Sequence, residues 1–166
     1  MKALVIDDER LARTELIRLL EPFKEIEIVG EAVNAEDAHN KISELNPDVI
    51  FLDIQMPGKT GFELLEELDS VPKVIFTTAY DEYALKAFEY NALDYLLKPI
   101  EPVRLEESIK KLIEGKRKER THGLSQETLT AEDQVFVKDG EKCWFVKLEK
   151  VRLFESEGNY VRLYFD

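Results

Sequence analysis

The chain has 166 residues, of which 44% are hydrophobic, and this composition suits one globular domain together with part of a second. Its formal net charge of −12 excludes binding to nucleic acid through bulk positive charge, which requires a basic surface. The charge is uneven, because residues 1–113 carry 13 Lys/Arg and 24 Asp/Glu whereas residues 114–166 carry 10 and 11. This difference indicates two parts with different roles.

The sequence also bears on location. Cys143 is the single cysteine, so no internal disulfide can form and nothing favours an oxidising compartment. The first residues become acidic at Asp7 and Asp8, too early for a signal peptide. No apolar run approaches the roughly 20 residues of a membrane span. We therefore expect a cytoplasmic protein that does not bind membranes.

In residues 1–113, short apolar runs alternate with amphipathic stretches. Runs rich in Val, Ile and Phe are typical of strands buried on both faces, and apolar side chains at helical spacing are typical of surface helices. This alternation predicts a doubly wound α/β fold with a five-stranded parallel sheet, in which ligands bind beyond the carboxyl ends of the strands. The expected strands are Ala3–Ile6, Ile26–Val29, Val49–Leu52, Val74–Phe76 and Tyr95–Leu97, and the expected helices contain Leu11–Leu20, Ala38–Leu45, Phe62–Leu68, Ala84–Phe88 and Leu105–Leu112.

The pattern changes from Glu114 onward. A charged run and the polar stretch Thr121–Thr130 predict the end of a helix followed by a linker. Four short segments of β type follow, separated by turn residues. They make up roughly 35 residues, below the size of about 40 residues at which a domain usually folds unaided, so they predict a partial β-rich domain. The expected strands here are Gln134–Val137, Cys143–Lys147, Val151–Phe154 and Tyr160–Phe165.

Three carboxylates lie at the ends of expected strands. Asp7 and Asp8 follow the first strand and Asp53 follows the third. Aspartate often occurs at strand ends without any metal. In a parallel sheet, however, these residues should converge at one edge, where their repulsion favours a hard divalent cation with oxygen ligands. The sequence therefore predicts a Mg²⁺ site.

Two further strand ends add groups that suit a phosphoryl group. Thr77 and Thr78 end the fourth strand, and a hydroxyl there can donate to a phosphoryl oxygen. Lys98 ends the fifth strand and supplies a compact cation for the same oxygens. Together with the carboxylates they predict a phosphoryl-transfer site, in which Asp53 is the natural nucleophile and becomes an aspartyl phosphate.

Four motifs resemble those of one known family. They are Val5–Glu9, Phe51–Gly58, Thr77–Ala79 and Leu97–Pro99, and their order and spacing resemble the flavodoxin-like receiver domain of bacterial two-component response regulators over residues 1 to about 118. The resemblance implies that Asp53 takes a phosphoryl group from a phosphohistidine on a sensor histidine kinase. It implies a switch that phosphorylates and dephosphorylates itself, and not an enzyme with turnover.

The resemblance also implies a set of metal ligands. Asp8 and Asp53 would bind Mg²⁺ directly, together with the backbone carbonyl of Gln55, and Asp7 would act mostly through water. Gln55 and Tyr80 stand at positions that tune the lifetime of the phosphate in this family.

The same resemblance implies the parts of a switch. Thr78 corresponds to the switch hydroxyl, Tyr95 to the aromatic residue that turns inward with it, and Lys98 to the lysine that contacts the phosphate. The bond between Lys98 and Pro99 is expected to be cis. We expect phosphorylation to change the surface formed by the fourth helix, fifth strand and fifth helix, so that it forms a symmetric dimer. The alternative is that the charges on this surface are only a solvated face. This mixed patch contains Lys86, Ala87, Phe88, Glu89 and Asp94.

Two stretches are similar to a narrower subgroup, the LytTR-type (LytR/AlgR-like) regulators. They are Thr78–Pro99 and Val151–Val161, and the second resembles the opening strands of a LytTR DNA-binding domain. The implied layout is a receiver at 1–118, a linker at 119–132 and the N-terminal fragment of an output domain at 133–166. DNA binding and transcription control would then require a complete output domain in a longer parent protein.

Three other functions compete with this interpretation. A stand-alone receiver would act only through protein contacts. A phosphatase of the haloacid dehalogenase kind would need a second aspartate where Gln55 stands. A flavodoxin-like electron carrier would need a Ser/Thr/Gly-rich phosphate loop after the first strand, and Asp7 and Asp8 stand there instead.

Overall fold

The computed structural model describes residues 1–122, 134–139, 142–147, 151–157 and 160–165. The chain forms two compact units, Met1–Arg117 and Lys118–Asp166. Among the described residues, no helix has the length and apolarity needed to cross a bilayer.

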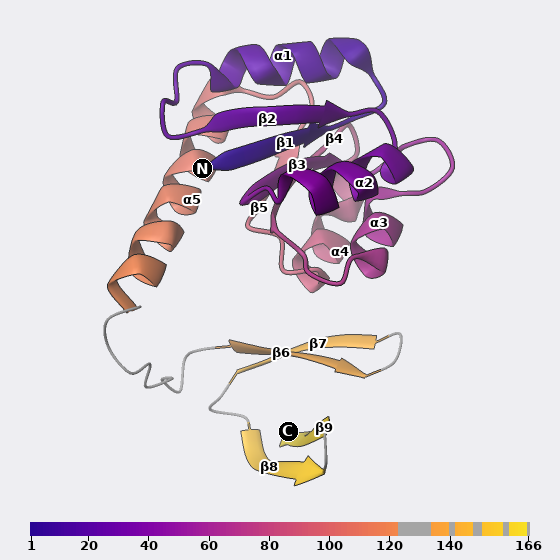
Figure 1. The fold of residues 1–166 in the computed structure, drawn as a ribbon, viewed down its shortest axis with the longest axis vertical. Coiled ribbons are helices and arrows are strands. Elements are labelled where there is room, and N and C mark those ends of the chain that lie inside the picture. The colour runs from indigo at the N-terminus through magenta and orange to yellow at the C-terminus, as the bar shows by residue number, and fades with distance from the viewer. Residues whose placement is uncertain (123–133, 140–141, 148–150, 158–159, 166) are drawn as a thin grey trace. The chain divides into compact units, whose positions relative to one another are not determined.

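The first unit is built on a five-stranded parallel sheet with the strand order β2-β1-β3-β4-β5 (Figure 1). This arrangement confirms the doubly wound α/β fold predicted from the sequence. The order reverses direction beside β1, so the ends of β1 and β3 lie next to each other at the switch point where such sheets bind ligands. The strands are β1 (Lys2–Ile6), β2 (Glu27–Ala32), β3 (Val49–Asp53), β4 (Lys73–Thr78) and β5 (Asp94–Leu97).

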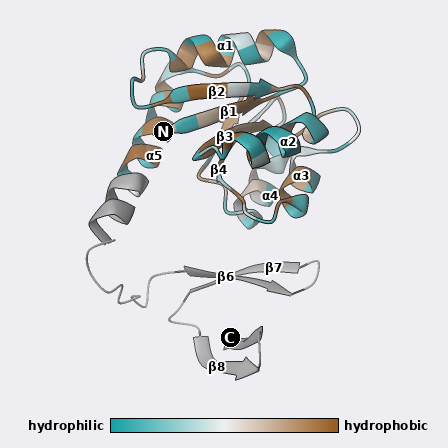
Figure 2. Cartoon of the chain, viewed as in Figure 1, coloured by the Kyte–Doolittle hydropathy of each residue, from teal (hydrophilic) through white to brown (hydrophobic). Residues whose placement is uncertain are grey.

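Helices cover both faces of this sheet. One hydrophobic core lies between the sheet and α1 and α5, and the other lies between the sheet and α2, α3 and α4. Figure 2 shows hydrophobic residues along the central strands, whereas α1 alternates between hydrophobic and hydrophilic positions. The helices are α1 (Arg10–Leu20), α2 (Ala35–Leu45), α3 (Gly61–Glu67), α4 (Ala84–Glu89) and α5 (Pro102–His122), and a 3-10 turn, η1 (Asp81–Tyr83), precedes α4.

The expectation that all five strands are buried on both faces is wrong for the two edge strands. In β2 only Ala32 is fully buried, and the strand extends to that residue rather than ending at Val29. In β5 Leu96 is buried but Leu97 is 47% exposed. The physical reason is position in the sheet, because an edge strand has a neighbour on one side alone.

Local signals in the loops set the starts of two helices. The side chain of Asn34 accepts a hydrogen bond from the backbone N–H of Asp37 and begins α2. Thr60 and Glu63 form a reciprocal capping box that begins α3 directly after the loop that follows Asp53.

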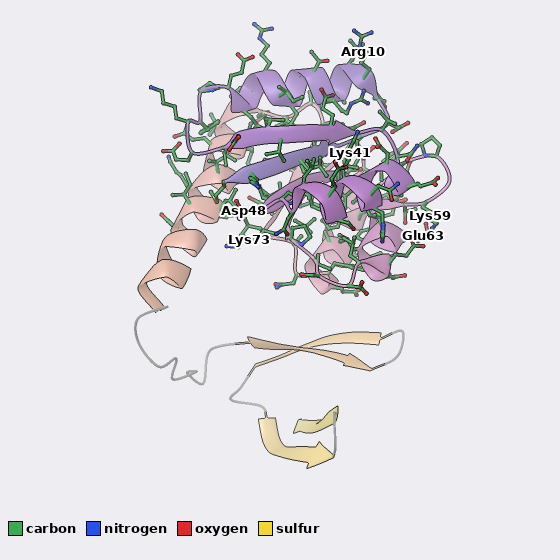
Figure 3. The ribbon with its side chains drawn as sticks, viewed as in Figure 1. Arg10, Lys41, Asp48, Lys59, Glu63 and Lys73 are labelled. Atoms are coloured by element: carbon green, nitrogen blue, oxygen red, sulfur yellow. The ribbon has the colours of Figure 1, made fainter. Side chains whose placement is uncertain are left out.

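Charged side chains surround this unit (Figure 3). Asp48, just before β3, accepts a hydrogen bond from the backbone N–H of Lys2 at 2.7 Å, and its carbonyl accepts one from the backbone N–H of Lys73 at 3.2 Å. These residues fix the amino-terminal ends of the strands. The carboxyl ends, where the acidic site lies, are at the opposite edge.

Helix α5 extends further than the sequence indicated. It continues to His122, into the range 119–132 that was predicted as linker. The physical reason is that the charged run beginning at Lys116 consists mostly of Lys, Arg and Glu, which are good helix formers. The rest of the predicted linker lies outside the described residues.

The second unit contains two antiparallel strand pairs, and this confirms the predicted strands. Strand β6 (Gln134–Asp139) pairs with β7 (Lys142–Lys147), and β8 (Val151–Glu157) pairs with β9 (Tyr160–Phe165). The turn residues between the strands of each pair lie outside the described residues.

Candidate functional site

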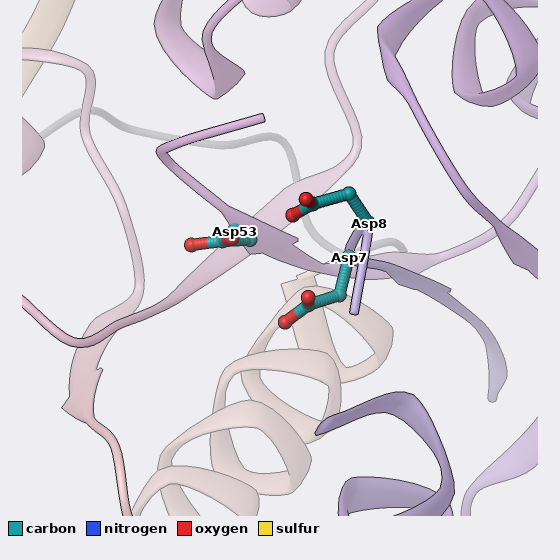
Figure 4. A group of neighbouring side chains, drawn as sticks. All are labelled: Asp7, Asp8 and Asp53. Carbon is teal, nitrogen blue, oxygen red and sulfur yellow. The ribbon is translucent and has the colours of Figure 1, made fainter. Parts of the chain in front are cut away.

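Three aspartates converge at the carboxyl edge of the sheet. Asp53 is the last residue of β3, and Asp7 follows β1, held by a 3.1 Å hydrogen bond from its backbone N–H to the carbonyl of Ala32. One carboxylate oxygen from each of Asp7, Asp8 and Asp53 lies within 4.8 Å of the others. Figure 4 shows the three side chains close together, extending to the same side. Asp7 and Asp53 are 3% and 5% exposed, whereas Asp8 is open to solvent.

Lys98 supplies the cation of the site. Its Nζ lies 2.6 Å from Oδ2 of Asp7 and 3.6 Å from Oδ2 of Asp53. Burial opposes its charge, but the hydrogen bond to Asp7 and the charge of Asp53 outweigh burial and raise its pKa. The backbone N–H of Lys98 donates to the carbonyl of Thr78 at 2.8 Å, and the peptide bond to Pro99 is cis, as predicted. Lys98 therefore stays charged between the two buried carboxylates.

The lysine does not offset the cost of burying the Asp53 carboxylate. Burial, together with the charge of Asp7, raises the pKa of Asp53 to about 6, although Lys98 and the backbone N–H groups of Ile54 and Gln55 oppose this increase. A divalent cation would lower that pKa by neutralising the repulsion. The donor set consists of carboxylate oxygens, which Mg²⁺ prefers, and they are close enough to share one ion. The residues present therefore fit Mg²⁺.

Gly61 allows α3 to begin against the back of Asp53. Its backbone N–H donates to the carbonyl of Ile54 at 2.8 Å. A Cβ atom at this position would lie 2.5 Å from the carbonyl oxygen of Asp53, so a side chain would displace the backbone of the proposed nucleophile. Gly61 was not predicted from the sequence to contribute to the site.

The predicted switch residues lie on β4 and β5. Thr78 is fully buried at the end of β4, and its hydroxyl oxygen accepts a hydrogen bond from the backbone N–H of Tyr80 at 3.4 Å. In the sheet register it is Thr77 that pairs with Asp53. Tyr95, half-buried on β5, donates its hydroxyl to the carbonyl of Tyr80. The two residues are thus connected through the loop after β4.

Gln55 lies in the loop between β3 and α3 and is exposed. Its side-chain amide donates to the hydroxyl of Tyr83 at 2.8 Å. The ring of Tyr83 packs edge-on against Phe62 and Tyr80. This bond connects the loop beside Asp53 to the turn that precedes α4.

Comparisons with known proteins agree with this geometry. The family model for the response regulator receiver domain matches residues 3–110. The chain belongs to the response regulator receiver family. It is 50% identical over 131 residues to an uncharacterized response regulatory protein of Vibrio cholerae, a match that covers 78% of this chain and 55% of that protein.

Relatives with assigned names and a solved receiver structure support the same family. The chain is 45% identical to the sensory transduction protein LytT of Bacillus cereus over 80% of this chain and 56% of that one, and 48% identical to the transcriptional regulatory protein BtsR of Escherichia coli over 72% and 51%. Its fold matches the response regulatory domain of mrkE from Klebsiella pneumoniae with a TM-score of 0.64 and 35% identity, covering 69% of this chain and 97% of that one. The chain spans about half the length of the curated relatives it matches.

The receiver differs from the sequence prediction on its α4–β5–α5 surface. Ala87 is 1% exposed, so it belongs to the core and not to a surface patch. Asp94 is also shielded from solvent, because Ser108, Arg104 and Lys111 bind its carboxylate. The physical reason is that these two side chains point toward α5 and the core, a direction that periodicity alone did not reveal. Lys86 and Glu89 are exposed, and the side chain of Phe88 lies outside the described residues.

One contact of the receiver's acidic loop was missed altogether. Arg13 on α1 is buried and binds the backbone of Asp7 and Asp8. The available signal was its position, because Arg13 lies three residues before Leu16 on the apolar side of the helix. A charged residue at such a position needs internal partners.

Proposed function

We propose that Asp53 accepts a phosphoryl group from a sensor histidine kinase and that the phosphate then switches the receiver. The observation that carries this proposal is the cluster of Asp7, Asp8 and Asp53, with carboxylate oxygens within 4.8 Å of one another and Lys98 bound to Asp7. Membership of the receiver family supports the choice of phosphoryl chemistry.

Mg²⁺ is the proposed cofactor. Asp8, Asp53 and the carbonyl of Gln55 would hold it directly, and Asp7 would hold it mostly through water. The ion supplies charge neutralisation for the phosphoryl oxygens. The raised pKa of Asp53 supports this assignment, since burial, its largest cause, disfavours the bare carboxylate, and a bound cation would favour the charged form.

The protein's own residues then perform the transfer. A carboxylate oxygen of Asp53 forms the new P–O bond as the P–N bond of phosphohistidine breaks, and the imidazole leaves with the electron pair. Lys98 can exchange its contact with Asp7 for a phosphoryl oxygen, because its ammonium is already within 3.6 Å of Asp53. We propose a switch that catalyses its own phosphorylation and dephosphorylation, without turnover of an external substrate.

The nucleophile can be tested by replacing Asp53→Asn and incubating the full chain with a small phosphodonor and Mg²⁺. We expect intact-mass spectrometry to show an added phosphoryl group on the wild type and none on the variant. Asp94→Asn is the matched control, because Asp94 is also a shielded aspartate of the sheet but lies on β5 among partners from α5. A phosphoryl group on the Asp53→Asn variant that hydroxylamine removes would overturn the assignment.

For the output we propose phosphorylation-dependent homodimerisation and, in a complete protein, DNA binding through a LytTR-type domain that begins at residues 133–166. The relative named a transcriptional regulatory protein and the two antiparallel strand pairs support this direction. The surface around Lys86, Glu89 and Leu97 remains available for the dimer. Mass in solution should double when beryllofluoride, a phosphoryl mimic, is added with Mg²⁺, and an unchanged monomer would contradict the dimer. The cytoplasmic location remains a prediction.

A further inference from the structure

Helix α1 buries a cation where a helix normally buries an apolar side chain. Its three buried residues are Arg13, Leu16 and Leu20, and the side chain of Arg13 is 11% exposed. Removing a guanidinium from water is unfavourable unless its N–H groups find acceptors inside the protein. The acceptors that Arg13 contacts therefore indicate its structural role.

Those contacts converge on the turn that carries two of the proposed metal ligands. Nη1 of Arg13 donates to the carbonyl of Asp7 at 2.7 Å and to the carbonyl of Asp8 at 3.3 Å. Nε donates to Oε2 of Glu31 on β2 at 2.9 Å. One planar side chain thus ties α1, β2 and the turn after β1 together.

Two further hydrogen bonds hold the same turn. The backbone N–H of Glu9 donates to Oδ1 of Asp7 at 2.9 Å, and the backbone N–H of Asp7 donates to Ala32 at 3.1 Å. These two bonds do not involve the carbonyl groups of Asp7 and Asp8. Arg13 fixes those carbonyl groups. The peptide planes on both sides of Asp8 determine where its carboxylate points, and Asp8 is the exposed member of the acidic cluster.

We propose that Arg13 is a positioning residue that holds Asp7 and Asp8 in the geometry that binds Mg²⁺. This inference rests on the proposed Mg²⁺ site. Arg13 contacts the backbone of the ligands and not the ion. Outer partners that orient metal ligands typically contribute about 10- to 100-fold to metal affinity. The fork of N–H donors matters, because the single ammonium of a lysine cannot occupy the Nε and Nη1 positions together.

The sign of the effect separates this role from simple electrostatics. Arg13 is a positive charge beside a cation site, so Coulomb's law predicts that its removal strengthens Mg²⁺ binding. Positioning predicts the opposite, because the carboxylates lose their alignment. Arg18 offers a matched control, since it is an exposed arginine on the same helix.

The test compares Arg13→Gln, Arg13→Lys and Arg18→Gln in the full chain. Isothermal titration calorimetry with MgCl₂ gives the affinity, and phosphorylation by a small phosphodonor is followed as a function of Mg²⁺ concentration. We expect both Arg13 variants to bind Mg²⁺ about 10-fold more weakly. The Mg²⁺ concentration at half-maximal rate should rise by a similar factor while the rate at saturating Mg²⁺ stays near that of the wild type. Arg18→Gln should bind Mg²⁺ as the wild type does, or slightly more tightly.

Glu31→Gln provides a second route if Arg13→Gln does not fold. It keeps an acceptor for Nε but weakens the bond, so we expect a loss of about threefold in Mg²⁺ affinity, in the range of one weakened hydrogen bond. Wild-type affinity in Arg13→Lys and Glu31→Gln would overturn the positioning role alone. A wild-type chain that binds no Mg²⁺ would overturn this role together with the proposed metal site.

Discussion

Asp53 and Asp94 are both shielded aspartates on strands of one sheet, yet their surroundings have opposite effects. Their side chains are 6% and 10% exposed. Burial acts to raise the pKa of both carboxyls. At Asp53 it prevails and the pKa rises to about 6, whereas at Asp94 hydrogen bonds and cations outweigh it and the pKa falls below its ordinary value.

The difference lies in the partners. The carboxylate of Asp94 accepts hydrogen bonds from Ser108 at 2.5 Å, Lys111 at 3.0 Å, Arg104 at 3.1 Å and the backbone N–H of Tyr95 at 2.9 Å. In the described part of the chain, the cation in contact with Asp53 is Lys98, whose shorter contact is with Asp7. Asp94 therefore fastens α5 to β5 and is satisfied. Asp53 is buried with fewer partners and a raised pKa, which is the arrangement expected of a group that reacts.

The largest expected effect is the difference in how much Mg²⁺ stabilises the Asp53 and Asp94 variants. At 100 times its dissociation constant the ion should raise the free energy of unfolding by about 2.7 kcal/mol, because it binds only the folded state. Asp94→Asn should keep this increase and Asp53→Asn should lose most of it. Urea denaturation followed by circular dichroism, with MgCl₂ or with EDTA, measures the difference. Equal stabilisation of both variants would break the contrast between the two sites.

The next effect concerns Asp94 itself. We expect Asp94→Ala to lower the free energy of unfolding by about 2 kcal/mol, because it removes the acceptor that Arg104, Lys111 and buried Ser108 share. Since its pKa is lowered in the folded state, the contribution of Asp94 is present at neutral pH and is lost as pH falls through that value. Exposed Asp69→Ala is the control, and a loss at Asp94 no larger than at Asp69 would contradict the structural role.

A smaller effect of opposite sign is expected for Asp53 in metal-free protein. Its pKa rises from the ordinary 3.8 to about 6 on folding, so the folded state binds the proton more tightly and stability declines as pH rises across that interval. Asp53→Asn removes this penalty and should stabilise the protein at pH 8 by roughly 1–2 kcal/mol, with a smaller gain near pH 4. Denaturation in EDTA at both pH values checks this, and a destabilised variant at pH 8 would show that Asp53 is as satisfied as Asp94.

The smallest effect is expected at the exposed bond between Gln55 and Tyr83 beside the acidic site. Tyr83→Phe removes the hydroxyl acceptor but keeps the ring against Phe62, so stability should fall by only about 0.5 kcal/mol. The same denaturation experiment applies, with Tyr90→Phe as the control for loss of a tyrosine hydroxyl, which in Tyr90 donates to Glu66. A loss as large as that of Asp94→Ala would mean that the loop is held as firmly as α5.

The sequence predicted the sheet and the acidic cluster because both depend on chain order. Strands that alternate with helices place their carboxyl ends together, so Asp7, Asp8 and Asp53 could be predicted to meet from the sequence alone. The limits of β2 could not be predicted as well, since Gly30 and Glu31 look like loop residues until the strand is known to lie at an edge.

Polar contacts between residues far apart in the chain could not be predicted from the sequence. Asp94 was interpreted as a surface charge because its partners Ser108 and Lys111 lie 14 and 17 residues away on another element. Arg13 was overlooked for the same reason, since its acceptor Glu31 is 18 residues away on an edge strand. Such pairings depend on how helices are rotated against the sheet, and hydrophobic periodicity fixes that rotation too coarsely for single polar contacts.

The edges of the sheet in the first unit also affect how concentrated solutions of the protein should behave. Strand β5 is four residues long and leads within two residues to Pro99, whose nitrogen carries no hydrogen. At the other edge, β2 carries exposed Glu27 and Glu31. A foreign strand would find few backbone partners at the first edge and charge at the second, and these features hinder amyloid-like stacking. Association of this unit would then depend on side chains, which makes it reversible by salt and dilution.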